Sequence, residues 1–143
     1  MELQKIEYKN LNSRQKENYN FQKVSTVLAD YGFVIFRVSD DWQGADFIAL
    51  HISGDVLRVQ LKGRLTFNCK YQKRGLFVAF AYGEAWYLYP HDELLDQVLK
   101  MTKIATTQSW SEQGIYHFPR LSNELRTVLE PYRLTGTASP IPE

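Results

Sequence analysis

Two apolar runs joined by a tight turn are the feature that most restricts the fold of this chain. Residues 45–52 (ADFIALHI) and residues 56–62 (VLRVQLK) have strand-like patterns, and residues 53–55 (SGD) between them are typical of a turn. We therefore expect the two runs to pair as a β-hairpin. Residues 33–38 (FVIFRV), rich in β-branched and aromatic side chains, predict another strand just before it.

A helix is predicted before these strands, within residues 11–33. Asn12 or Ser13 suits its N-cap, and Gly32 suits the left-handed position just past its end. Its apolar side chains recur every three or four residues: Phe21, Val24, Leu28 and Tyr31. Glu17 lies four residues before Phe21, so it is either a solvated residue of the first turns or a carboxylate that faces the sheet.

The rest of the chain continues the same mixed pattern. The further predicted elements are a second hairpin at residues 76–90, a helix at 91–101, a short strand at 115–118 and a last helix within 122–132. We predict an α/β fold with one domain at residues 1–134, followed by a flexible tail at 135–143 that contains only turn and breaker residues.

Composition narrows the class of protein. A chain of 143 residues that is 44% hydrophobic can bury one core and is not typical of disorder. Its net charge of +1 neither requires nor excludes nucleic acid. Cys69 is the single cysteine, which excludes an internal disulfide and a cysteine-rich zinc site. No secretory signal or membrane span is visible, so the sequence predicts a soluble cytoplasmic protein without a membrane partner.

Polar side chains make the first hairpin chemically distinctive. Gln60 and Lys62 are two residues apart in a strand and therefore share a face, while Asp46 opens the partner strand. Because the first helix packs on the sheet, Glu17 is expected to approach the same group. The other interpretation is that Arg58, Gln60 and Lys62 form the solvated face of an antiparallel strand.

Such a group suits Mg²⁺ and phosphate chemistry. Mg²⁺ prefers oxygen ligands and often completes its shell with water and substrate phosphate. Asp46 and Glu17 offer carboxylate oxygens, and Gln60 offers a neutral carbonyl oxygen. Lys62 is suited to orient or deprotonate an attacking water, or to stabilise charge on the phosphoryl oxygens.

The order Glu17, GADF at residues 44–47 and VQLKGR at residues 59–64 resembles the PD-(D/E)XK nuclease superfamily. The resemblance implies a restriction-endonuclease-like αβββαβ core with a mixed sheet, to which this chain adds an extra hairpin and a C-terminal helix. By this resemblance Asp46 matches the first acidic position, Lys62 the lysine, and Glu17 the helix carboxylate of many members. Gln60 stands where Asp or Glu is usual, as in the Gln-x-Lys variants of some members.

Within the superfamily, VQLKGRLTF at residues 59–67 and WYLYPHDELL at residues 86–95 are most similar to bacterial group I intron-encoded homing endonucleases of the PD-(D/E)XK type. This resemblance implies a Mg²⁺-dependent endonuclease that cuts specific sites in double-stranded DNA at the nucleoid. It also implies a homo-oligomer, a dimer or a tetramer, on a pseudo-palindromic site.

A basic segment follows the hairpin. Residues 62–75 contain five cationic side chains and no acid. Four of them are candidate contacts to DNA phosphates: Arg64, Lys70, Lys73 and Arg74. Phe67 and Tyr71 between them either pack in the protein or stack on bases. The other interpretation of the segment is a solvated loop.

Two alternative functions stay open. One is another nuclease of the superfamily, such as a Holliday-junction resolvase or a restriction-type enzyme. The other is a DNA-binding member that kept the fold and lost the chemistry. Gln60 favours the inactive member, whereas Glu17, Asp46 and Lys62 favour the enzymes.

Overall fold

The computed structural model describes residues 1–135, without the side chains of residues 40–42, so residues 136–143 of the predicted tail lie outside the described part. Its helices are α1 (Ser13–Ala29), α2 (His91–Met101) and α3 (Asn123–Leu129). Its strands are β1 (Phe33–Trp42), β2 (Ala45–His51), β3 (Val56–Lys62), β4 (Leu65–Asn68), β5 (Leu76–Tyr82), β6 (Ala85–Pro90), β7 (Ile115–Phe118) and β8 (Arg133–Leu134).

Six of the strands form one mixed sheet in the order β1-β2-β3-β5-β6-β8. Neighbouring strands are antiparallel except β3 and β5, which are parallel. The crossover between these two strands contains β4, which pairs with β7 in a separate two-stranded sheet, and a 3₁₀ turn at Cys69–Tyr71. The α/β class predicted from the sequence is confirmed.

The first hairpin forms as predicted. The ladder joins residues 47–50 of β2 to residues 56–59 of β3, and the turn is closed by the His51 amide, which donates to the Asp55 carbonyl over 2.8 Å. Gly54 in this turn has a φ of +98°, a conformation that favours glycine. β1 is longer than the predicted strand at residues 33–38, because its pairing with β2 resumes at Trp42 after a register shift.

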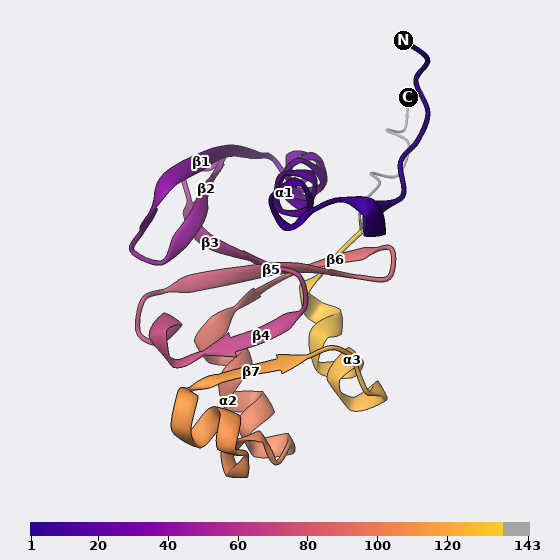
Figure 1. Cartoon of the computed structure of the whole chain (residues 1–143). Coiled ribbons are helices and arrows are strands. Elements are labelled where there is room, and N and C mark those ends of the chain that lie inside the picture. The colour runs from indigo at the N-terminus through magenta and orange to yellow at the C-terminus, as the bar shows by residue number, and fades with distance from the viewer. Residues whose placement is uncertain (136–143) are drawn as a thin grey trace.

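Helix α1 covers one face of the sheet, as Figure 1 shows. Asn12 caps the helix, since its side chain accepts from the Gln15 amide while the Gln15 side chain accepts from the Asn12 amide. Val24 and Leu28 are fully buried against the sheet. The buried residues of this layer, the α1-side core, are Val24, Leu28, Phe47, Ala49, Val59 and Ala79.

The opposite face is covered over β5 and β6 by α2, α3 and the β4–β7 pair (Figure 1). A larger core lies there, in which Phe67, Phe80 and Tyr89 are fully buried. None of the helices in the described part is long and apolar enough to cross a membrane. The sheet is therefore a central layer, and the ends of β1, β2 and β3 meet the start of α1 at one of its margins.

Candidate active site

Strands β2 and β3 separate at the position of Asp46. Their regular pairing stops at Phe47 and Val59. Beyond that pair, Asp46 Oδ2 accepts a hydrogen bond from the Leu61 amide over 2.8 Å. A carboxylate thus binds a backbone amide of the neighbouring strand where the regular ladder ends. This bond fixes the Asp46 side chain at the open end of the hairpin.

A hollow of about 710 Å³ opens beside Asp46. It lies between the start of α1 and the ends of β1, β2 and β3, and both Glu17 and Asp46 line it. The other lining residues are Ser13, Arg14, Asn18, Phe21, Arg37, Val38, Ser39, Ala45 and Leu61. The structure therefore brings together the two carboxylates that the sequence analysis singled out. We call this space the Glu17–Asp46 hollow.

Gln60 is buried, with 6% of its surface exposed. Its Nε2 donates to the Gly44 carbonyl over 2.6 Å. Since a carbonyl can only accept, this contact fixes which end of the amide is the NH₂ group and leaves Oε1 for another partner. The solvated-face interpretation is wrong for Gln60: with the Asp46–Leu61 bond, its side chain ties the start of β2 to the end of β3.

Lys62 points elsewhere. Its Nζ lies 5.6 Å from the centroid of the Tyr71 ring, a cation–π contact. Lys62 also lines a separate hollow of about 590 Å³ that reaches Tyr19 and Trp86. It does not line the Glu17–Asp46 hollow in the described part of the chain. The predicted group of four is therefore only partly assembled.

Strand alternation explains this division. Leu57, Val59 and Leu61 of β3 pack in or against the α1-side core. Gln60 and Lys62 alternate with them and so belong to the opposite face of the sheet. A ligand that contacts Glu17 on one side and Lys62 on the other has to sit at the open margin, where β2 and β3 separate.

The sequence analysis missed Arg37 at this site. Arg37 Nη1 donates to Asn18 Oδ1 over 2.7 Å, and its guanidinium lies 4.6 Å from the centroid of the Phe21 ring. It therefore lines the hollow as a cation beside the two carboxylates. The sequence contains a signal for it, because Arg37 lies two residues after Ile35 and four after Phe33 and therefore shares the face of β1 that packs against the α1-side core.

The basic segment is structured rather than a solvated loop. Phe67 is fully buried and Tyr71 is 7% exposed, so both pack in the protein and neither is free to stack on a base. Arg58 Nη2 donates to the Arg74 carbonyl over 2.6 Å, which anchors the far end. The four predicted phosphate contacts, Arg64, Lys70, Lys73 and Arg74, are all exposed.

His117 on β7 lies near the beginning of this segment. Its Nδ1 is 2.9 Å from Thr66 Oγ1. Partial burial, and then the positive charges of Arg64 and Lys62, lower the pKa of His117 below its ordinary value. His117 thus lies close to Lys62 and Arg64, and these surroundings favour the neutral form of its imidazole.

The donor atoms at the Glu17–Asp46 hollow suit Mg²⁺ better than a soft metal. No group of three or more His, Cys, Asp or Glu side chains that could hold a metal occurs within the described residues. The two carboxylates that line the hollow are hard oxygen donors, and the Gln60 amide oxygen, which does not line it, is a third such donor on the adjoining strand β3. Such a small set fits an ion that keeps several waters and shares substrate phosphate.

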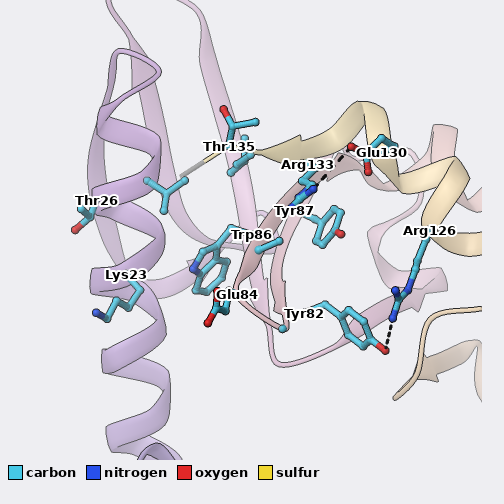
Figure 2. Close-up of a pocket in the computed structure, with 14 residues that line it drawn as sticks. Lys23, Thr26, Tyr82, Glu84, Trp86, Tyr87, Arg126, Glu130, Arg133 and Thr135 are labelled. Carbon is cyan, nitrogen blue, oxygen red and sulfur yellow. Dashed lines mark hydrogen bonds and ion pairs between the residues drawn. The ribbon is translucent and has the colours of Figure 1, made fainter. Parts of the chain in front are cut away.

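A larger hollow, of about 990 Å³, contains none of the predicted site residues. Figure 2 shows it between α1, the β5–β6 turn, α3 and β8. Arg126 Nη2 lies 3.4 Å from the Tyr82 hydroxyl and, as the main cause, lowers the pKa of that hydroxyl. Arg133 lies 4.0 Å from Glu130. Because cations and carboxylates are mixed here, this hollow is a weaker candidate for phosphate.

Comparison with solved structures identifies the fold. The chain is similar to a bacterial homing endonuclease, I-Ssp6803I, a PD-(D/E)XK enzyme, with a TM-score of 0.51 over 85% of this chain and 86% of that one. The two sequences are 15% identical, so the likeness concerns the fold. It confirms the restriction-endonuclease-like fold that the resemblance implied. No protein-family model and no curated protein sequence matches the chain.

Proposed function

We propose that this protein is a Mg²⁺-dependent endonuclease that hydrolyses phosphodiester bonds at specific sites in double-stranded DNA, as a homing endonuclease does. The observation that carries the proposal is the convergence of Glu17 and Asp46 on one hollow, at the open end of a hairpin whose other strand bears Gln60 and Lys62. The homing-endonuclease fold supports it. The protein acts as a homo-oligomer at the nucleoid, in the cytoplasm.

Asp46 and Glu17 would hold the metal, with the Gln60 amide oxygen as a neutral third donor. When bound, Mg²⁺ supplies charge neutralisation at the scissile phosphate and a more acidic water. Asp46 is suited to this role because its hydrogen bond to the Leu61 amide holds the carboxylate in place. Gln60 is likewise positioned by the Gly44 carbonyl.

The cations at the margin divide into two groups. Arg37 and Arg14 line the hollow with the carboxylates and would contact phosphate oxygens there. Lys62 would reach the phosphate from the opposite face by leaving its position over Tyr71. A lysine in that place can stabilise the developing negative charge or orient the attacking water.

A DNA-binding protein without catalysis is the second candidate. Gln60 brings no charge to the metal site, and two carboxylates are a small set. Holliday-junction resolvases and restriction-type enzymes are the alternatives among active nucleases. These functions predict different substrates, so one experiment separates them.

The proposal is tested by incubating the full chain with a genomic library of long duplexes and with a four-way junction, in Mg²⁺ and in EDTA. We expect duplex cleavage in Mg²⁺ only, with sequenced ends that fall at one recurring motif. Cleavage confined to the junction would favour a resolvase. Duplex binding without cleavage at any divalent ion concentration would favour the inactive member and contradict the proposal.

The exposed basic side chains of the segment after β3 are expected to set DNA affinity. Replacing Lys70, Lys73 and Arg74 together with Ala should weaken binding and reduce the slope of log K against log salt by about 0.9 for each phosphate that is no longer neutralised. Fluorescence anisotropy at several salt concentrations measures this slope. Lys9, Lys100 and Lys103 replaced together provide the control with an equal change in net charge. An unchanged slope would exclude the segment from the DNA interface.

A further inference from the structure

A hollow of about 590 Å³ lies beside Lys62 and has no part in the proposed metal site. It is bounded by α1, the end of β3 and the turn between β5 and β6. Three aromatic side chains line it, Tyr8, Tyr19 and Trp86, together with the cations Lys23 and Lys62. We call this space the Tyr19–Trp86 hollow. Its volume is within the range of small-molecule sites, roughly 300–1,000 Å³, so it has room for a ligand the size of a nucleotide.

The aromatic residues of this hollow are partly exposed. The ring centroids of Tyr8 and Tyr19 lie 5.3 Å apart, and the two residues are 40% and 37% exposed. Asn20 Nδ2 donates to the Tyr8 hydroxyl over 2.9 Å, which ties Tyr8 to α1. Trp86 packs against the α1-side core with part of its surface exposed, and Figure 2 shows its indole on the side of β6 that faces α1. Aromatic faces held by the fold therefore meet solvent in the hollow.

Lysine side chains accompany these rings. Lys23 Nζ lies 5.3 Å from the centroid of the Tyr19 ring. Lys16 Nζ lies 5.4 Å from the centroid of the Tyr8 ring. Glu84 is the one acid that lines the hollow within the described residues, and it is exposed. Proteins bind single-stranded nucleic acid with this combination, because aromatic rings stack on the bases while cations contact the phosphates. Bases inside a duplex are stacked on one another and do not offer a free face.

The Tyr19–Trp86 hollow adjoins the Glu17–Asp46 hollow. Of two consecutive residues in β3, Leu61 lines the Glu17–Asp46 hollow and Lys62 the Tyr19–Trp86 hollow. Asn18 and Tyr19 of α1 divide in the same way. A Cβ added to Gly63, which also lines the Tyr19–Trp86 hollow, would meet no atom within 4 Å, so the backbone there is open to a ligand. A DNA strand with a phosphate at the proposed metal site therefore has a neighbouring nucleotide beside this second hollow.

We propose that the Tyr19–Trp86 hollow binds one unpaired base of a DNA strand, with the base stacked on Trp86 and the adjoining phosphates contacted by Lys23 and Lys62. The inference rests on the proposed function, and it adds that the strand being cut is unstacked next to the scissile phosphate. Glu84 repels phosphate at the same hollow, so Glu84→Gln should bind a single strand more tightly than wild type. The hollow is thus a site for single-stranded DNA that is separate from the proposed metal ligands.

The test is the affinity of the full chain for a fluorescein-labelled strand of about 12 thymidines, measured by anisotropy in EDTA so that no strand is cut. Trp86→Leu and Tyr19→Leu should each weaken binding by about fivefold or more, because a base can no longer stack on an aromatic ring. Leucine keeps an apolar side chain at both positions, and circular dichroism with the unfolding midpoint checks the fold. Tyr31→Leu is the matched control and should bind like wild type, because Tyr31 is 38% exposed but lies past the C-terminal end of α1, outside the hollow.

Lys23→Gln tests the phosphate contact. The slope of log K against log salt for the thymidine strand should fall by about 0.7, the value for one phosphate of a single strand. Lys100→Gln removes the same charge in the last turn of α2, outside the hollow, and should leave the slope at the wild-type value. A wild-type slope for Lys23→Gln would contradict a phosphate contact at Lys23.

A strand that carries bromouracil in place of thymine locates the bound base in the wild-type protein, because ultraviolet light links bromouracil to an adjacent aromatic side chain. We expect the linked peptide to contain Trp86 or Tyr19. Links confined to residues 64–75, wild-type affinity in both leucine variants, or no binding of the strand by wild type would overturn the proposal. Displacement of the strand by an equal nucleotide concentration of free thymidine monophosphate would also overturn it, since the hollow would then be a site for free nucleotides. Strand binding by a protein that cleaves no DNA would leave the inference standing and contradict only the proposed function.

Discussion

Asp46→Asn is expected to reduce Mg²⁺-dependent DNA cleavage by at least about 100-fold, because it removes one of the two carboxylates in the proposed metal site. The substitution is nearly isosteric. An asparagine oxygen can still accept the hydrogen bond that the Leu61 amide gives to Asp46. The open end of the hairpin should therefore keep its geometry while the negative charge is removed. Single-turnover cleavage rates across a Mg²⁺ titration measure the effect.

Asp30→Asn is the control for removal of one acidic charge. Asp30 is exposed at the C-terminal end of α1, whereas Glu17 lies near the start of this helix, and Asp30 does not line the Glu17–Asp46 hollow. The cleavage rate of Asp30→Asn should remain within about twofold of the wild-type rate, as for a surface substitution away from the site. If Asp46→Asn binds DNA as tightly as wild type, its lost activity is a loss of the cleavage step and not of DNA binding. If Asp46→Asn cleaves at the wild-type rate throughout the titration, Asp46 is not a metal ligand.

The elements that local sequence defines were predicted well. The third strand runs over Val56–Lys62 as expected, and the SGD turn before it closes the hairpin. Asn12 is the N-cap of α1, and its capping box needs only residues within one helical turn. Alternation and capping act over a few residues, which explains why they can be read without a tertiary structure.

Pairing between strands that are far apart in the sequence could not be predicted from local patterns. The strand β4 lies inside the basic segment and is paired with β7, where Thr66 contacts His117 from 51 residues away. The extension of β1 through residues 39–42 has polar residues that are typical of a loop, and its pairing with β2 makes it a strand. In both cases hydrogen bonding to a distant segment outweighed local propensity.

The candidate site shows the same limit. Sequence order predicted that Glu17 and Asp46 approach each other, and they line one hollow. It could not predict that Gln60 would be buried against the Gly44 carbonyl, because that contact depends on where β2 and β3 separate. Lys62 rests over Tyr71, whose burial follows from the fold of the crossover. The catalytic roles of these residues stay predictions.

Lys62→Ala is expected to lower the cleavage rate by at least about 100-fold, the range in which removal of a positioned acid, base or charge acts. DNA affinity should change by less than about tenfold at fixed salt, because Lys62 is one cation beside several exposed ones. The contact with Tyr71 contributes only about 0.5–1 kcal/mol at a partly exposed site, so the variant should stay folded. Lys70→Ala, which removes an exposed lysine of the same segment, is the control.

Lys62→Arg then distinguishes the two roles that a lysine can have here. Arginine keeps the positive charge but does not lose its proton in proteins. If Lys62 stabilises charge on the phosphate, the arginine variant should recover part of the activity that alanine removes. If Lys62 deprotonates the attacking water, arginine should be as inactive as alanine, and the wild-type rate should rise with pH while the variant rate does not. Because Lys62 has to leave Tyr71 to reach the margin where β2 and β3 separate, full activity of Lys62→Ala would mean that it remains over the ring and takes no part in cleavage.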